Sequence, residues 1–132
     1  MNFLSKFQPQ LLSVLRITSA YMFMQHGTAK LFGIPYVERF ENLQLTSMVG
    51  IAGLLEVFGG LLLLLGLFTR QVAFVLSGLG AAAYFIGHAP KGTPLVPFMN
   101  GGEPAALFCF IFLFIAAAGP GAWGLDNKFG KK

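Results

Sequence analysis

The feature that most constrains the fold is the segment from residue 46 to residue 68, "TSMVGIAGLLEVFGGLLLLLGLF". Apart from two hydroxyl residues at its start, its only polar side chain is Glu56. A helix of about 20 such residues can cross the hydrocarbon core of a bilayer. Composition agrees, because 55% of the chain is hydrophobic and 11% is charged, whereas a soluble domain carries about a quarter charged residues. The sequence therefore indicates an integral membrane protein.

Three further segments are apolar enough to join this one, and each ends at glycine or proline. Within a bilayer every backbone polar group must be satisfied internally, so these segments are expected to be helices. A chain of 132 residues makes one domain. We therefore predict an all-α, membrane-embedded four-helix bundle formed by residues 1–132, with spans at about 11–32, 46–68, 71–89 and 103–118. A tight turn is expected at Thr69-Arg70.

The basic residues predict how the bundle is oriented. An even number of spans puts both termini on one side, together with Lys6, Arg70, Lys128, Lys131 and Lys132. Loops rich in Lys and Arg face the cytoplasm. We expect a multi-pass protein of the cell (inner) membrane with cytoplasmic N- and C-termini. A cleaved signal peptide is not expected, because Arg16 interrupts the first apolar run and that run continues beyond it.

Charged residues within the spans indicate which faces point inward. On a helix, Arg16, His26 and Lys30 fall within an arc of roughly 80°. Charged groups facing lipid are costly, so this stripe should face the bundle interior. Glu56 lies near mid-bilayer with glycines three or four positions away, which would let a neighbouring helix approach. We expect Glu56 to face the first span and to pair with Arg16.

A second polar group is expected at the outer end of the bundle. Tyr84 and His88 lie on one seam of the third span, and His88 reaches the level of His26. Glu103 opens the fourth span, where a carboxylate suits the positive end of the helix dipole. We expect His26 and His88 on facing helices around a small polar pocket, with Lys30, Asn100 and Glu103 nearby.

Each of these residues also has a purely structural interpretation. An Arg16–Glu56 pair would fix helix register, the histidines would bond interfacial carbonyls, and Glu103 would only complement a helix N-terminus. Cys109 is the single cysteine, which excludes an internal disulfide, and no metal site is expected. Scattered basic residues exclude nucleic acid as a partner. The placement of several polar groups on inward faces is what favours a functional site.

The chain resembles the DoxX family of small four-span membrane proteins. The matching motifs are "LRI" with Arg16, "QHGTAKLFG" with His26 and Lys30, "EVFGGLLLLLGLFTR" with Glu56, "NGGEPAAL" and "GPGAWGLD", which together run from residue 15 to residue 126. The sequence departs from the family at "AWGLD", where "RWSLD" is common, so no role is carried over to positions 122 and 124. The resemblance implies a four-helix bundle in a redox setting, because named relatives are linked to quinones, thiols or catechols.

Three functions remain open on the sequence alone. The first is a quinone-linked redox component or an oxidoreductase subunit, with Glu56, His26 and His88 as catalytic groups. The substrate-binding groups would be Arg16, Lys30, Tyr84, Asn100 and Glu103. The second is a small permease or proton-coupled carrier, and the third is a membrane scaffold that recruits a redox partner protein. Whether the chain is itself enzymatic is left open. The cofactor is unknown, with quinone the candidate. The chain is expected to lie in the lipid bilayer, and whether it forms an oligomer is left open.

Overall fold

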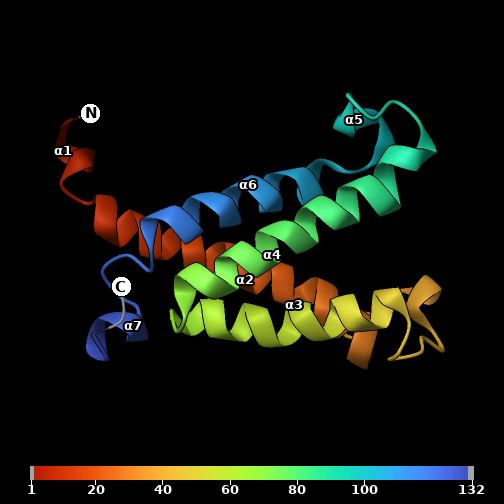
Figure 1. The fold of residues 1–132 in the computed structure, drawn as a ribbon, viewed down its shortest axis with the longest axis horizontal. Coiled ribbons are helices and arrows are strands. Elements are labelled where there is room, and N and C mark those ends of the chain that lie inside the picture. The colour runs from red at the N-terminus through yellow and green to blue at the C-terminus, as the bar shows by residue number, and fades with distance from the viewer. Residues whose placement is uncertain (1, 131–132) are drawn as a thin grey trace.

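The computed structural model describes residues 2–130, and all of the regular structure in that range is helical. Four long helices form a bundle: α2 (Gln8–Phe32), α3 (Met48–Leu65), α4 (Thr69–Ala82) and α6 (Glu103–Ala118) (Figure 1). The short elements lie at the ends and in the connections: α1 (Asn2–Ser5), η1 (Glu38–Phe40), η2 (Ala83–His88), η3 (Ala89–Lys91), α5 (Pro97–Asn100) and α7 (Leu125–Lys128). The predicted all-α four-helix architecture is confirmed.

The helix ends follow from local sequence. α2 and α3 end at Gly33 and Gly66, whose backbones adopt the left-handed conformation with φ of 67° and 72°. Ser47 caps the start of α3, because its side chain accepts a hydrogen bond from the Gly50 N–H at 3.1 Å. The turn between α3 and α4 is formed by residues 66–68, so the predicted turn at Thr69-Arg70 is wrong. Glycine ends the helix there, two residues before the hydrophobic run stops.

The third apolar segment is continuous but changes its helical type. α4 passes into η2, a π-helical turn, and then into η3, so helical backbone extends from residue 69 to residue 91. Within residues 2–130, Met48–Leu65 and Thr69–Lys91 are long and apolar enough to cross a membrane, and α6 is a shorter apolar helix. A π-turn inserts into the regular hydrogen-bond ladder and re-aims the side chains around it. Here it leaves Tyr84 buried.

The bundle is built from two tightly packed helix pairs. The most extensive packing joins α2 to α3 and α4 to α6, whereas α2 and α6 contact each other much less. The core between the pairs is formed by large side chains, chiefly Phe23, Leu63, Leu76, Phe108, Phe112 and Ile115. Many other aromatic and aliphatic side chains lie exposed on the outside of the bundle. An apolar exterior of this extent is typical of a surface that faces lipid.

At the end of the bundle that holds both termini, the C-terminal segment folds back onto the turn between α3 and α4 (Figure 1). The Asp126 carboxylate accepts hydrogen bonds from the backbone N–H groups of Phe68 and Thr69 at 2.8 and 2.9 Å. The Asp126 N–H in turn donates to the Gly66 carbonyl at 2.9 Å. This carboxylate therefore satisfies free N–H groups at the start of α4 and fixes the C-terminal segment there.

Candidate functional site

A buried ion pair joins α2 to α3. The Lys30 Nζ lies 2.5 Å from the Glu56 Oε1, and the two side chains are 14% and 6% exposed. Close helix packing makes this contact possible, because Gly27 lies directly against the backbone of Gly53 and the Cβ of Glu56. The prediction that Glu56 faces the interior and contacts the first helix is confirmed.

The predicted partner of Glu56 is wrong. Arg16 is 1% exposed, and its guanidinium donates to the Pro120 carbonyl and, at 3.4 Å, to the Leu64 carbonyl. The opposite charge that acts on Arg16 is Asp126. Gly27 is level with Glu56. Arg16 lies eleven residues before Gly27, which is roughly 16 Å away from that level toward the start of α2. Lys30 is one turn away on the same face, so the closer cation forms the pair.

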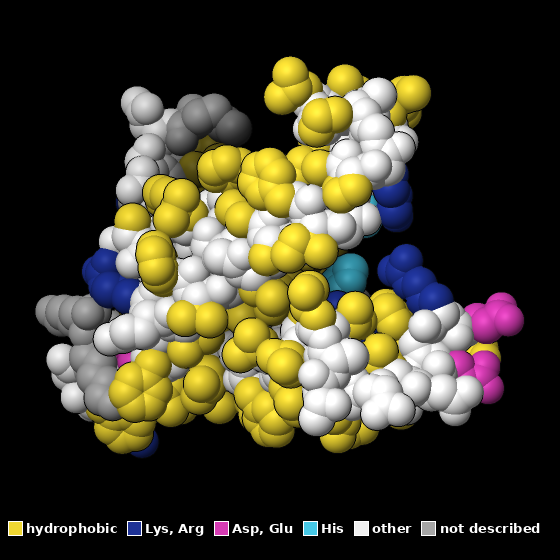
Figure 2. Space-filling view, turned by 45° about the vertical axis from the view of Figure 1, so that its right-hand side comes forward, with side chains coloured by type: hydrophobic (Ala, Val, Ile, Leu, Met, Phe, Trp, Pro, Cys, Tyr) yellow, Lys and Arg dark blue, Asp and Glu magenta, His cyan; other side chains and the backbone are white. Residues whose placement is uncertain are grey.

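A groove of about 540 Å³ opens beside this ion pair, at the end of the bundle opposite the termini. Figure 2 shows it as a hollow between two projecting parts of the surface, with histidine and basic side chains around it. Its walls come from α3, η1 and the segment from α4 to η3. The lining is mostly aliphatic with a few cationic or titratable groups, and it comprises Lys30, Arg39, Phe40, Leu43, Met48, Val49, Ile51, Ala52, Leu55, Leu79, Ala82, Ala83, Ile86, Gly87, His88 and Lys91.

His88 lines the groove and is oriented by the next connection. Its Nδ1 lies 3.3 Å from the Asn100 carbonyl oxygen. A carbonyl only accepts hydrogen bonds, so this contact requires the proton on Nδ1. In the neutral ring Nε2 is then the acceptor, and it is the nitrogen that this contact leaves free for a ligand.

Tyr84 and Asn100 hold the connection between η3 and α6 in place. The Tyr84 hydroxyl donates to the Pro94 carbonyl at 2.5 Å and accepts from the Asn100 Nδ2 at 3.0 Å. The Asn100 Oδ1 accepts from the Gly102 N–H at 2.9 Å. Their polar atoms are committed to protein partners, so the geometry favours a supporting role over the substrate contact that the sequence suggested.

The structure does not bring His26 or Glu103 into the groove. The His26 ring packs edge-on against Phe108 of α6, with centroids 5.9 Å apart, and it is absent from the groove lining although the charges of Lys30 and Arg39 act on it. Glu103 is exposed at the start of α6 and, within residues 2–130, pairs with neither Lys30 nor a histidine. The expectation of one pocket around both histidines is therefore wrong. Helical periodicity predicted that the two histidines lie at similar depth, but it could not predict which neighbouring helix each ring would contact.

Two groove residues were missed by the sequence reasoning, Arg39 and Lys91. Both lie on short helical turns in the connections, and no role in the site was predicted for either. Arg39 stacks over the Phe40 ring with its Cζ 4.9 Å from the centroid, and the Lys30 Nζ lies 5.7 Å from the same centroid. For Arg39, the available signal was a basic residue beside an aromatic one in a connection at the end opposite the termini.

An acidic and a phenolic side chain on the same connection pair with each other. The Tyr36 hydroxyl donates to the Glu41 carboxylate at 2.9 Å. That bond raises the pKa of Tyr36, because it favours the protonated phenol. Neither residue lines the groove.

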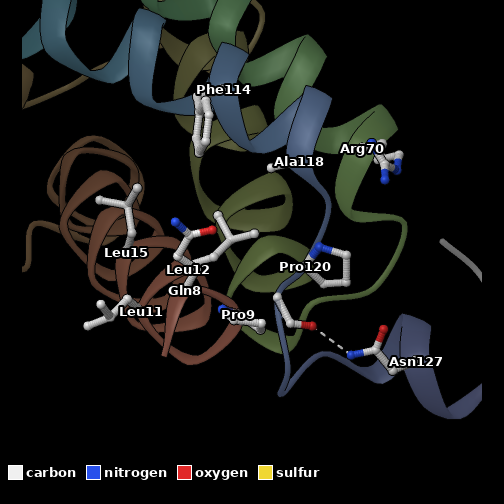
Figure 3. Close-up of a pocket in the computed structure, with 11 residues that line it drawn as sticks. Gln8, Pro9, Leu11, Leu12, Leu15, Arg70, Phe114, Ala118, Pro120 and Asn127 are labelled. Carbon is white, nitrogen blue, oxygen red and sulfur yellow. Dashed lines mark hydrogen bonds between the residues drawn. The ribbon is translucent and has the colours of Figure 1, made fainter. Parts of the chain in front are cut away.

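A second cavity, of about 730 Å³, lies at the end of the bundle that holds the termini, between the start of α2 and the end of α6 (Figure 3). Leu11, Leu12, Leu15 and Phe114 form its apolar walls. Asn127 lies at its rim, where its side chain donates to the Gly121 carbonyl at 2.7 Å. Among the described residues, no cluster of three or more His, Cys, Asp or Glu side chains offers a metal site.

The sequence was compared with protein families and with known proteins. The DoxX family model matches residues 11–89, which is more than half of the chain. A Haemophilus influenzae protein described as uncharacterized is 48% identical and covers both chains completely. Two Escherichia coli K12 proteins, inner membrane proteins YqjF and YphA, are 30% and 31% identical; the alignments cover 90% and 92% of this chain and 92% and 91% of theirs. No solved structure matches significantly. The chain belongs to the DoxX family of membrane proteins.

Proposed function

We propose that this protein is an inner-membrane component of a quinone-linked redox system and that its outer groove binds the quinone. The observation that carries this proposal is the position of Lys30, which lines an apolar groove and is also paired with the buried Glu56. A titratable pair beside a lipid-accessible slot suits a ligand that is apolar in its tail and exchanges protons at its ring. Relatives named as inner membrane proteins support the location.

The lining residues divide the binding task between ring and tail. Lys30 would donate a hydrogen bond to a quinone carbonyl, and the His88 Nε2 would accept one from a quinol hydroxyl. Glu56, behind Lys30, is the next proton acceptor. Aliphatic side chains of α3 and η2, such as Ile51, Leu55 and Ile86, would contact the isoprenoid tail. Electrons would be exchanged with a partner redox protein.

Quinone binding should depend on His88 and not on His26. We expect a short-chain quinone such as decylubiquinone to bind the purified protein, and His88→Ala to weaken binding roughly five- to tenfold, the effect of one lost hydrogen bond. His26→Ala is the matched control and should bind as the parent does. The measurement is a titration followed by isothermal calorimetry, on variants whose thermal unfolding is unchanged.

Two results of this titration would contradict the proposal. One is that the parent protein does not bind the quinone at all. The other is that His26→Ala and His88→Ala weaken binding equally, because only His88 lines the groove. Solute flux through liposomes without quinone binding would favour the carrier function instead.

We also propose that all four long helices cross the membrane, with both termini in the cytoplasm. The charge distribution supports this orientation, since five basic residues (Lys6, Arg70, Lys128, Lys131 and Lys132) belong in sequence to the terminal segments and the start of α4, against three (Lys30, Arg39 and Lys91) toward the other end. A reporter that is active only in the periplasm should be silent when fused after Lys132 and active when inserted in the connection at residues 91–96. The reverse pattern would place the groove on the cytoplasmic side.

A further inference from the structure

We propose that the outer groove selects the anionic form of its ligand, namely a quinone that carries an ionised ring hydroxyl, over a neutral quinone with the same tail. This inference rests on the proposed quinone function and specifies which chemical class the site prefers. It follows from the charges that line the groove, the segments that carry them and the apolar walls between them.

The charged lining is entirely basic. Lys30, Arg39 and Lys91 line the groove together with His88, and none of the described lining residues is acidic. Glu56 balances the charge of Lys30. Within residues 2–130, neither Arg39 nor Lys91 forms an ion pair. The groove therefore carries two cations with no counter-charge of its own, which a bound anion would supply.

These two cations lie on different connections. Arg39 belongs to η1, in the connection between α2 and α3, and Lys91 ends η3, in the connection between α4 and α6. Both line the same groove, and Figure 2 shows basic side chains on both sides of the hollow. The acidic side chains visible in Figure 2 lie at the edge of the molecule, outside the hollow. An anion that enters the groove would be attracted by Arg39 on one connection and by Lys91 on the other.

The apolar walls make the charges more effective. Charges attract each other more strongly beside a low-permittivity surface than in open water. The groove volume of about 540 Å³ lies within the usual range for a pocket that holds one small organic molecule. The occupant should thus be an amphiphile with one flat anionic head and one apolar tail. A hydroxyl conjugated to a quinone carbonyl ionises at neutral pH, so it supplies such a head.

The test compares two ligands that have the same ring and alkyl chain but differ at one oxygen, which is ionised in the first and methylated in the second. One is a 2-hydroxy-3-alkyl-1,4-naphthoquinone, which is ionised at neutral pH, and the other is its 2-methoxy analogue with the same alkyl chain. We expect the hydroxy compound to bind the parent protein at least about tenfold more tightly, as one or two partly exposed charge contacts allow. The preference should decrease as salt concentration rises.

Two charge-matched variants locate the effect. Arg39→Gln/Lys91→Gln should reduce the preference to less than about threefold, because it removes both unpaired cations of the groove. Lys6→Gln/Lys128→Gln removes the same charge from exposed positions at the other end and should leave the preference intact. Binding of the methoxy compound should change little in either variant.

Each outcome has a distinct meaning. Equal binding of the two naphthoquinones to the parent would overturn the charge selection and leave the proposed quinone function standing. Failure of both compounds to bind would overturn the proposed function itself. Equal loss of preference in the two double variants would also overturn the inference, since net charge and not the groove would then be responsible. Dodecanoate, tested as a competitor, should displace the hydroxy compound only weakly; equally tight binding would assign the groove to lipid acids.

Discussion

Glu56→Leu is expected to remove most of the folded protein. The substitution leaves the Lys30 ammonium without its partner at a position where that side chain is only 14% exposed. Breaking a buried ion pair from one side costs about 3–5 kcal/mol of the free energy of unfolding, a large part of the stability of a small domain. Lys30→Met should cost a similar amount, because it strands the Glu56 carboxylate, which is 6% exposed.

The double variant Lys30→Met/Glu56→Leu separates charge pairing from packing. If the cost of each single variant comes from the stranded partner, the double variant should be clearly more stable than either single one. Glu56→Gln should be intermediate, since an amide oxygen still accepts a hydrogen bond from Lys30 without its charge. Glu103→Leu is the control: this carboxylate is exposed at a helix N-terminus, and its loss should cost no more than about 1 kcal/mol.

The measurement is unfolding in detergent micelles followed by circular dichroism, with yield of monodisperse protein as a second observable. A double variant as unstable as the sum of the two single variants would contradict the pairing argument. Equal loss for Glu56→Gln and Glu56→Leu would show that the charge, and not the hydrogen bond, is what the position requires.

The sequence predicted the fold well because the bilayer restricts the possibilities. Apolar length and the need to satisfy every backbone group leave only helices for a chain of this composition. The end of the fourth span at residue 118 was predicted from the "GPG" that follows it, and α6 does end at Ala118. The end of the second span was placed three residues too late, because hydrophobicity continues past Gly66 while the helix ends there.

The site was predicted less completely, for reasons that lie in three-dimensional packing. Helical periodicity identified the face of α2 that carries Lys30 and Arg16, but not which of the two would be level with Glu56. That depends on the stagger of α2 against α3, which is set by the contact of Gly27 with Gly53. Arg39 and Lys91 were missed because connections follow no period that would aim their side chains.

The contact between α2 and α3 leads to the second large prediction, that Gly27→Ala will separate these helices. A Cβ at position 27 would lie 2.7 Å from the Val57 Cγ2, 2.8 Å from the Gly53 carbonyl oxygen and 2.9 Å from the Glu56 Cβ. A backbone oxygen on a facing helix cannot move aside by itself, so the whole helix must shift. Overpacking of this kind costs about 1–3 kcal/mol.

Gly78→Ala provides the matched control for this substitution. Gly78 also lies within a long helix, α4, but a Cβ there would meet nothing within 4 Å. Its substitution by alanine should be neutral or stabilise the protein by up to about 1 kcal/mol, the difference in helix propensity between the two residues. Comparison of the two variants in the same detergent therefore isolates the steric effect of the α2–α3 contact.

Gly27→Ala should also affect ligand binding, because Lys30 lies one turn further along the same face of α2. A shift of α2 away from α3 lengthens the contact between the Lys30 Nζ and the Glu56 Oε1, which is 2.5 Å in the parent protein. We expect quinone affinity to fall in Gly27→Ala and to remain unchanged in Gly78→Ala, measured by the same titration. If Gly27→Ala unfolds like the parent and binds as tightly, the two helices have room at this position, and the stagger that pairs Lys30 with Glu56 must be set elsewhere along their interface.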